Sequence, residues 1–285
     1  MADSARSGRY PASLSPSRAA DFTTCPLLYR FRAIDRLPEA PSAAAVRGTL
    51  VHRALELLFG LPAAQRTPSA AADLLVASFV EMEQHSPDEA DALRPRPGAP
   101  PDIDGDRFLK SYFALEDPRR LEPHACEIAV SSVVCDELEL RGYVDRVDRT
   151  ADGRVRIVDY KTGRSPSEAF AGKAMFKMRF YALEWWRMTG EIPALLQLMY
   201  LGDAQVLRHS PDADDLLATE RRLLALRDAI SRAADTEFAP RPSRLCDWCS
   251  HRSLCPAWEG TPPPLPPRSE WPTAMTRQRG RDPES

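Results

Sequence analysis

Apolar and polar residues alternate most clearly between residues 142 and 163, in the stretch GYVDRVDRTADGRVRIVDYKTG. Two short runs, residues 143–147 and 155–158, are rich in β-branched and aromatic residues, which favour strands. Asp152 and Gly153 lie between the runs, and an Asp-Gly pair is a strong signal for a two-residue hairpin turn because both positions tolerate positive φ. The stretch therefore predicts a β-hairpin.

Helices and strands alternate along the rest of the chain. Apolar residues at spacings of three and four predict helices at residues 15–24, 42–59, 69–84, 104–116, 167–189 and 210–234. Shorter apolar runs predict strands at residues 125–134, 194–201 and 205–209. Ser15 before Pro16, and Gly190 after the long helix, are typical of helix starts and ends. We expect an α/β protein in which the helical block covers the sheet.

Composition limits the class of protein and the partners. The chain has 285 residues, of which 43% are hydrophobic and 28% charged, and this suits one large domain. A net charge of −3 gives no global signature of a nucleic-acid binder, although a local basic groove would suffice. No apolar run approaches the roughly 18–20 residues of a membrane span, and residues 1–10 lack the apolar core of a signal peptide. We therefore expect a cytoplasmic protein without a membrane partner, whose six cysteines are thiols or metal ligands.

Charged residues on the hairpin point to a metal site. Asp145 lies on the first strand, while Asp159 and Lys161 lie two positions apart on the second. Strand side chains alternate between faces, so Asp159 and Lys161 share a face and Tyr160 points the other way. Two carboxylates and a lysine at the end of an apolar sheet are costly to bury unless they are paired. A hard divalent cation with oxygen ligands would pair them.

Cysteines near the C-terminus are spaced as metal ligands. Three of them lie within ten residues: Cys246, Cys249 and Cys255. Zinc and iron–sulfur sites usually have four protein ligands, and Cys25, which also precedes a proline, is the natural fourth. An iron–sulfur cluster, a zinc site completed by His251, and inert thiols are the three alternatives. Cys126 and Cys135, in or beside a strand, are interpreted as small core residues.

Taken together, these motifs resemble those of the RecB-family nucleases of the PD-(D/E)xK superfamily, in the branch that carries an iron–sulfur cluster. Relatives in that branch include the nuclease part of AddB and the CRISPR-associated adaptation exonucleases. The matching stretches are residues 47–52 (RGTLVH), 142–148 (GYVDRVD) and 158–163 (VDYKTG), together with the four cysteines. The likeness runs from about residue 14 to residue 258, and the ordered set is far more specific than Asp-x-Lys alone. It implies a restriction-endonuclease-like core, with a mixed central sheet flanked by helices, an N-terminal helical region and a C-terminal cysteine cluster.

The resemblance also implies a role for each site residue. Four groups would bind Mg²⁺ or Mn²⁺: His52, Asp145, Asp159 and the carbonyl of Tyr160. Without the resemblance, a lone helical histidine such as His52 would be interpreted as satisfied or solvent-facing. Lys161 would orient or deprotonate the attacking water, and Glu127, by default an exposed strand residue, would support the metal. Four thiolates would hold a 4Fe-4S cluster: Cys25, Cys246, Cys249 and Cys255.

One position departs from the family pattern. The helix after Asp-x-Lys usually carries Gln-x-x-x-Tyr, and here the stretch is Lys177-Met178-Arg179-Phe180-Tyr181. Tyr181 is kept as a residue of the catalytic site, whereas Lys177 replaces the glutamine. A lysine at this position could contact the DNA backbone or perturb the metal site.

The implied substrate is DNA, processed from single-stranded ends during repair or recombination. Five basic residues near the motif could hold phosphates: Arg146, Arg164, Lys173, Lys177 and Arg179. The sequence contains no GxxxxGK[ST] motif, so a helicase partner would be a separate polypeptide.

Two other hypotheses fit the same residues. One is a non-catalytic DNA-binding module of a helicase–nuclease complex, and the other is a zinc-stabilised protein-interaction domain. In domain terms, we expect a disordered N-terminus at residues 1–12 and a nuclease domain at 13–259 with a helical insertion at about 60–120. A disordered Pro-rich tail is expected at 260–285.

Overall fold

In the computed structural model of the chain, residues 10–11, 13–135 and 138–272 are described. The chain divides into two compact units, each composed of separate stretches of sequence. Of the described residues, unit 1 contains 10–11, 13–40, 131–135, 138–142 and 217–272, and unit 2 contains Pro41–Val130 and Tyr143–Leu216. Within the described ranges, no helix combines the length and the apolar character needed to cross a membrane.

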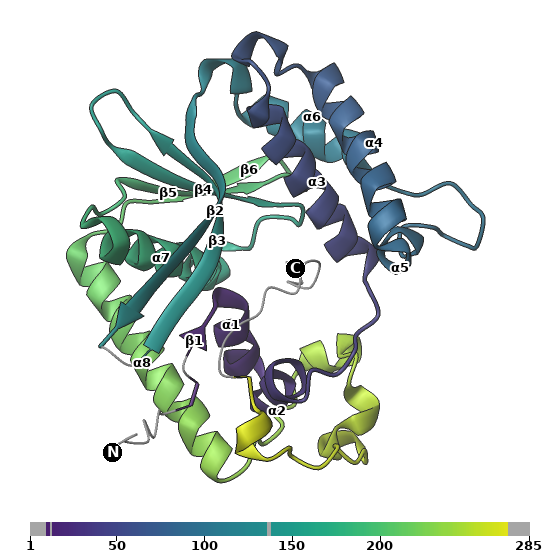
Figure 1. Ribbon diagram of the computed structural model, residues 1–285, viewed down its shortest axis with the longest axis vertical. Helices are drawn as coiled ribbons and strands as arrows, with labels where there is room; N and C mark the ends of the chain where they lie inside the picture. The colour runs from purple at the N-terminus through teal and green to yellow at the C-terminus, as the bar shows by residue number, and fades with distance from the viewer. Residues whose placement is uncertain (1–9, 12, 136–137, 273–285) are drawn as a thin grey trace, which may run out of the picture. The chain divides into compact units, whose positions relative to one another are not determined.

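The predicted mixed sheet is confirmed. Its strands are β1 (Ser13–Leu14), β2 (Pro123–Val134), β3 (Leu138–Arg149), β4 (Val155–Lys161), β5 (Leu195–Tyr200) and β6 (Gln205–His209). β3 pairs antiparallel with β4, β4 parallel with β5, and β5 antiparallel with β6, while β1 and β2 both pair with β3. A parallel pair needs a crossover connection, and α7 (Glu168–Thr189) supplies it between β4 and β5 (Figure 1).

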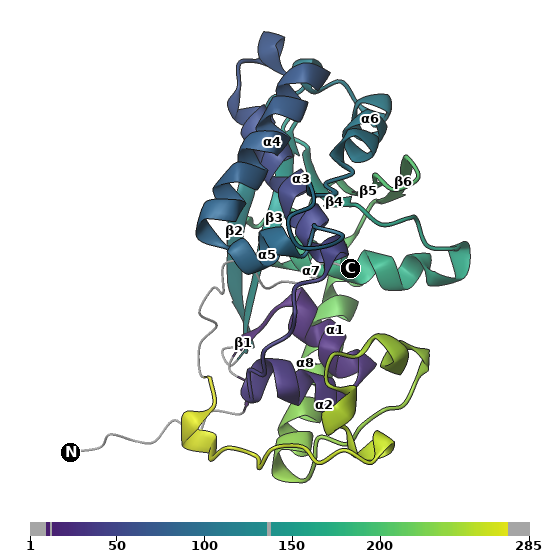
Figure 2. The same ribbon diagram turned by 90° about the vertical axis from the view of Figure 1, so that its right-hand side faces the viewer.

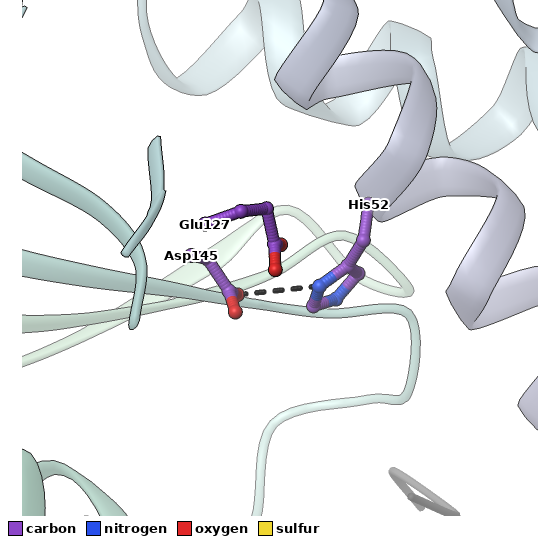
Figure 3. A group of neighbouring side chains, drawn as sticks. All are labelled: His52, Glu127 and Asp145. Carbon is purple, nitrogen blue, oxygen red and sulfur yellow. Dashed lines mark ion pairs between the residues drawn. The ribbon is translucent and has the colours of Figure 1, made fainter. Parts of the chain in front are cut away.

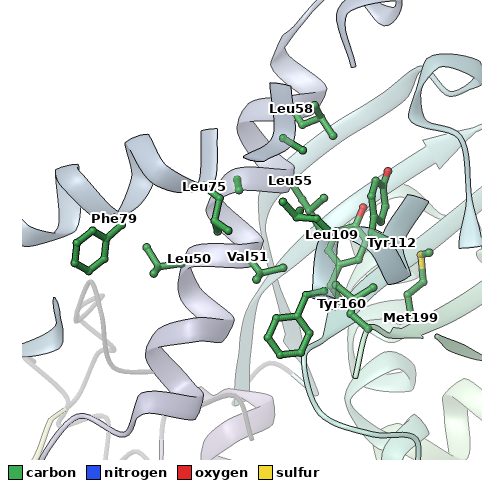
Figure 4. Close-up of a cluster of buried hydrophobic side chains, with 14 of the residues drawn as sticks. Leu50, Val51, Leu55, Leu58, Leu75, Phe79, Leu109, Tyr112, Tyr160 and Met199 are labelled. Atoms are coloured by element: carbon green, nitrogen blue, oxygen red, sulfur yellow. The ribbon is translucent and has the colours of Figure 1, made fainter. Parts of the chain in front are cut away.

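Helices cover both faces of the sheet in unit 2. The helical block consists of α3 (Ala43–Gly60), α4 (Pro68–His85), α5 (Pro87–Asp91) and α6 (Gly105–Leu115), with short 3-10 turns at Ala63–Gln65 and Pro118–Arg120. α3 lies between the sheet and α4 (Figure 1), and its leucines pack with Tyr160 of β4 and Met199 of β5 (Figure 4). α7 contacts β4 and β5 on the other face. Strand side chains alternate between faces, so Asp159 points away from the face of Tyr160, and there it forms an ion pair with Lys177 of α7.

Local signals at the predicted helix ends are confirmed. The hydroxyl of Ser15 accepts a hydrogen bond from the N–H of Arg18 (3.3 Å) at the start of α1 (Pro16–Thr24). Ser42 caps α3 in the same way, and Gly190 ends α7 with a φ of 75°. These caps satisfy backbone groups that the helices leave without partners.

The predicted hairpin forms from β3 and β4, but its turn is longer than the two residues predicted. Arg149 pairs with Val155, so residues 150–154 form the loop. The N–H of Gly153 donates to the carbonyl of Thr150 (2.9 Å), and Gly153 takes a φ of 87°. Asp152 has no positive φ, so the glycine alone supplies the left-handed position, as in longer hairpin loops.

Unit 1 holds the remaining elements. These are α2 (Pro26–Tyr29), a π-helical turn (Arg30–Ile34), α8 (Ala213–Asp235, whose first residues belong to unit 2) and 3-10 turns at Arg244–Trp248, Arg252–Leu254, Pro256–Trp258 and Arg268–Glu270. In both views, the segment with residues 244–258 lies beside α1 and α2 (Figures 1 and 2). Segments from both ends of the range that carries the resemblance therefore lie in one unit.

The predicted boundaries of disorder need correction. Trp271, predicted as part of a disordered tail, is buried, and its ring packs edge-on against Tyr10 with centroids 4.7 Å apart. Its ring also lies near Phe238, at 6.2 Å. Residues 10–11 and 260–272 are described, and the contacts of these aromatic rings hold Tyr10 and Trp271 in unit 1. The other residues of the predicted disordered segments, 1–9, 12 and 273–285, lie outside the described residues.

Candidate active site

His52 is placed by the buried face of α3. Leu50, Val51 and Leu55 are each at most 1% exposed and hold the helix against its neighbours, which directs His52 toward the end of β4. Nε2 of His52 lies 3.0 Å from the carbonyl oxygen of Tyr160. Because a carbonyl only accepts, Nε2 carries the proton, and in the neutral ring Nδ1 then presents a lone pair.

Three side chains from three elements converge in unit 2 (Figure 3). The ligand atoms of His52 from α3, Glu127 from β2 and Asp145 from β3 all lie within 4.8 Å of one another. Nδ1 of His52 lies 3.3 Å from Oδ2 of Asp145, so a lone pair faces a carboxylate oxygen in the neutral ring. A positive charge stabilises this contact, either as a second proton on His52, which makes it an ion pair, or as a metal ion among the three side chains. Opposite ligands of octahedral Mg²⁺ are about 4.2 Å apart at bonds of about 2.1 Å, so the residues fit a Mg²⁺-sized ion.

Backbone features position two of these side chains, Asp145 and Glu127. Oδ2 of Asp145 accepts a hydrogen bond from the backbone N–H of Tyr160 (2.8 Å), which fixes the carboxylate against the neighbouring strand. Glu127 has a φ of 47°, in the left-handed region that non-glycine residues rarely adopt. This departure from the extended strand changes the direction of its side chain, and such strain is frequent at functional sites. The predicted support of the metal by Glu127 therefore has a geometric basis.

Asp159 meets lysines rather than the group just described. Its carboxylate is fully buried, with Oδ2 at 2.9 Å from Nζ of Lys161 and Oδ1 at 3.0 Å from Nζ of Lys177. A buried carboxylate needs counter-charge, and the two ammonium groups provide it. His52, Glu127 and Asp145 are called the 4.8 Å group from here on. Asp159 does not belong to it, so its predicted part as a metal ligand stays a prediction.

The two tyrosines of the predicted site have distinct surroundings. The carbonyl of Tyr160, predicted as a metal ligand, contacts His52, while its fully buried phenol accepts a hydrogen bond from Arg146. Burial raises the pKa of the Tyr160 phenol well above its usual value, so the group stays neutral. Tyr181 is buried on α7, and Nζ of Lys177 lies 5.4 Å from the centre of its ring.

Arg146 was expected near the phosphates, and this expectation is wrong. Its side chain is fully buried, forms ion pairs with Glu116 and Asp148, and lies over the ring of Phe59. The signal missed in the sequence is Asp148, two positions along the same strand and so on the same face as Arg146. Arg146 therefore stabilises the fold, because a buried guanidinium with two carboxylate partners is not available to DNA.

The four predicted cluster ligands line one small cavity in unit 1. Apolar residues, among them Leu27, Phe31 and Trp258, line the rest of its wall. The backbone N–H of Arg241 donates to Sγ of Cys25 (3.4 Å). Sγ of Cys246 likewise accepts from a backbone N–H, that of Ser243, at 3.3 Å. The second contact also caps the 3-10 turn Arg244–Trp248, so backbone N–H groups orient both sulfurs within unit 1.

His251 lines the same cavity but has another partner. Its Nε2 lies 2.7 Å from Oε1 of Glu39, and its ring packs edge-on against Phe31. Hydrogen bonding by His251, and then by Arg32, lowers the pKa of Glu39 to about 2, so the carboxylate is charged. The contact with Glu39 uses Nε2 of His251, and metal-bound imidazoles commonly make such a carboxylate contact through their other nitrogen, so a zinc site with His251 stays a prediction.

The remaining cysteines differ from each other. Cys126 is partly buried against the core of unit 2, and burial raises the pKa of its thiol to about 11. Cys135, predicted as a core residue, is exposed. Its φ of 49° lies outside the extended range at the end of β2, which explains why strand alternation misplaced it.

Comparisons with known proteins bear on the fold and the family of the chain. A crystal structure of a candidate exonuclease from Eubacterium rectale matches with a TM-score of 0.55 at 13% identity, covering 84% of this chain and 88% of that one. The structure of SSO0001 matches with a TM-score of 0.39 at 13% identity, covering 87% of both chains, which is too weak to carry an argument. No curated protein sequence matches the chain.

The first of these structural matches supports the fold. At 13% identity it says nothing further about activity. Residues 13–256 match the family model described as the PD-(D/E)XK nuclease superfamily, and this range contains every predicted ligand and catalytic residue. The chain belongs to the PD-(D/E)XK nuclease superfamily.

Proposed function

We propose that this protein is a divalent-metal-dependent DNA nuclease of the RecB family, an exonuclease that acts on single-stranded ends in repair or recombination. The observation that carries the proposal is the convergence of His52, Glu127 and Asp145 within 4.8 Å, beside the Asp159–Lys161 pair, in a chain of this superfamily. DNA hydrolysis requires positive charge at the scissile phosphate and an activated water.

The chain's own residues supply most of this chemistry. His52, Glu127 and Asp145 would hold Mg²⁺ or Mn²⁺, which when bound lowers the pKa of a coordinated water and neutralises phosphate charge. Lys161, anchored by Asp159 at 2.9 Å, would hold the attacking water or a phosphate oxygen by charge-assisted hydrogen bonds. The N–H of Tyr160 keeps Asp145 in place throughout.

A 4Fe-4S cluster at the four cysteines is the second part of the proposal. Tetrahedral zinc holds its sulfur ligands about 3.8 Å apart, because Zn–S bonds are about 2.3 Å long. Among the described residues, no three cysteine sulfurs lie mutually within 4.8 Å, although all four cysteines line one cavity. This wider spacing favours a cluster, in which several iron atoms separate the ligands. Iron and zinc content of the anaerobically purified protein tests the choice.

An exposed aromatic group in unit 1 supports the preference for single strands. Trp248 is 78% exposed, and Trp258 nearby in sequence is 42% exposed with the guanidinium of Arg252 3.9 Å from its ring centre. Large indoles are rarely left so open in soluble domains. Unpaired bases stack on such rings, and arginines beside them attract the backbone.

The test uses purified, cluster-loaded protein with Mn²⁺ and matched linear and circular single strands, labelled at the 5′ or the 3′ end. We expect degradation of the linear strands only, and loss of this activity in Lys161→Ala. Equal cleavage of circles would contradict the exonuclease assignment, and unchanged activity in the variant would contradict the role of Lys161.

One observation favours a second candidate, a non-catalytic DNA-binding module of a helicase–nuclease complex, with the helicase on another polypeptide. Lys177 neutralises Asp159 at 3.0 Å, whereas the family pattern has glutamine at this position. This candidate predicts salt-dependent binding of single strands without cleavage under any divalent metal.

A further inference from the structure

Lys177 lies at the centre of the site rather than at its edge. It stands on α7 between Met175 and Met178, which are buried against the sheet, so the helix is held close to β4. Its Nζ reaches Oδ1 of Asp159 at 3.0 Å. The ammonium also lies 5.4 Å from the ring centre of Tyr181, one helical turn further along, which adds a cation–π attraction.

Both lysines contact the carboxylate of Asp159, each at a different oxygen. Lys161 takes Oδ2 of Asp159 and Lys177 takes Oδ1, and this carboxylate is fully buried. Both ammonium groups are themselves largely covered, with about a fifth of each side chain exposed. Charges this poorly hydrated interact more strongly than exposed ones, so the arrangement is firmly held.

Charge balance shows what the second lysine changes. Three carboxylates, on Glu127, Asp145 and Asp159, and the two ammonium groups sum to one negative charge when His52 is neutral, and the guanidinium of Arg53 also interacts with Glu127. Without Lys177 the charge of the site would be more negative by one unit. A divalent ion therefore meets a less attractive site here than glutamine would leave, while the phosphate of a DNA strand meets a more attractive one.

The position of the ammonium also bears on the number of ions. In two-metal sites the ions are about 3.5–4 Å apart and share carboxylate ligands. The 4.8 Å group offers one cluster of ligand atoms, and Asp159 is the further carboxylate beside it, because the next residue, Tyr160, contacts both His52 and Asp145. Lys177 already occupies one oxygen of that carboxylate, and Lys161 the other.

We propose that Lys177 is a built-in second cation: it neutralises Asp159, limits the site to one divalent ion and lowers the affinity for that ion. This inference rests on the proposed function, because it assumes that His52, Glu127 and Asp145 form the metal site. Lys177 acts on the metal through charge and through Asp159, so it is a positioning residue rather than a metal ligand.

The experiment is calorimetric titration of the full-length protein with Mn²⁺ in the absence of DNA. The wild type is expected to bind one ion, and Lys177→Gln to bind Mn²⁺ about five- to tenfold more tightly, the effect of one unit charge on a nearby divalent ion. Lys177→Arg keeps the charge and is expected to stay within about twofold of the wild type. Lys110→Gln, an exposed lysine on α6, is the matched control and should leave the affinity unchanged.

Two results would overturn the inference: a wild type that binds two ions, or equal Mn²⁺ affinity in the wild type and Lys177→Gln. Failure of the proposed function gives a different result. If Asp145→Asn binds Mn²⁺ as the wild type does, the assumed metal site is wrong, and the inference fails with it. Circular dichroism and thermal unfolding of each variant show whether the fold is retained.

Discussion

Two groups of side chains proposed to bind metals differ in chemistry and in spacing. In unit 2, nitrogen and oxygen atoms of His52, Glu127 and Asp145 crowd within 4.8 Å of one another. In unit 1, four cysteines line an apolar cavity, and no three of these described sulfurs come that close. Hard ligands at short spacing suit one small divalent cation, whereas soft ligands at wide spacing suit a cluster.

Under the proposal, each group takes its own inorganic partner. The carboxylates of Glu127 and Asp145 in unit 2 repel each other, and a cation offsets that repulsion. The cysteines of unit 1 are held by backbone N–H groups and apolar walls, and Arg241 and Ser243 donate to two of the sulfurs. We expect a change in one group to leave the chemistry of the other intact.

The largest effect is expected from Asp145→Asn. The substitution removes a charge from the 4.8 Å group and weakens the acceptor for the N–H of Tyr160, so Mn²⁺ binding should be lost. Cleavage of single strands should fall by at least about a thousandfold. Iron content and visible absorbance should not change. Asp106→Asn, at an exposed position on α6, serves as the control, and retained cleavage in Asp145→Asn would refute the assignment.

The next largest effect is expected from Cys249→Ser, which tests the cysteine group of unit 1. We expect loss of absorbance at about 400 nm and of bound iron, with a melting temperature lower by ~5 °C or more, because ligands and folding are coupled. The exposed Cys135→Ser is the control. A variant that keeps its iron would show that Cys249 is not a ligand.

A smaller effect is expected from Trp248→Ala. Loss of one stacking ring should weaken single-strand binding by roughly five- to a hundredfold while Mn²⁺ affinity stays the same. Fluorescence anisotropy with labelled oligonucleotides measures this, and Leu265→Ala, 42% exposed, is the control. If Trp248→Ala and Leu265→Ala bind single strands equally well, Trp248 is not part of the proposed DNA-binding surface.

The smallest effect is expected from Glu39→Gln and depends on pH. Glu39 is the ion-pair partner of His251, which lines the cysteine cavity. The pKa of Glu39 is lowered to about 2 in the folded protein, chiefly by its hydrogen bond with His251. A depressed carboxyl pKa contributes stability above the unfolded value of about 4.3 and loses it as the pH falls from there toward 2. Glu39→Gln should therefore lower the melting temperature more at pH 7 than at pH 3. Glu237→Gln, at an exposed position, should show no such difference.

Much of the fold could be predicted from local patterns. Apolar periodicity located α1, α3, α7 and the strands, and Ser15 and Gly190 marked the start of α1 and the end of α7. The order of motifs also predicted that His52, Glu127 and Asp145 would serve one site, which the structure brings together. Each of these features depends on residues close in sequence or on a recurring motif.

What could not be predicted depends on long-range packing. Arg146 is buried because Glu116, thirty positions away, reaches its guanidinium. Trp271 is ordered because Tyr10 and Phe238 surround its ring. The pairing of Lys177 with Asp159 depends on how α7 packs on β4, and spacing alone showed only that a lysine replaced the glutamine.

The most direct test of the metal site is anomalous diffraction from crystals of the intact protein soaked in Mn²⁺. Data collected on either side of the manganese absorption edge distinguish Mn²⁺ from the iron of the proposed cluster. We expect one Mn²⁺, bound by His52, Glu127 and Asp145, with Lys177 still in contact with Asp159. A Mn²⁺ bound by other residues, or a second Mn²⁺ that displaces Lys177 from Asp159, would contradict the proposed metal site.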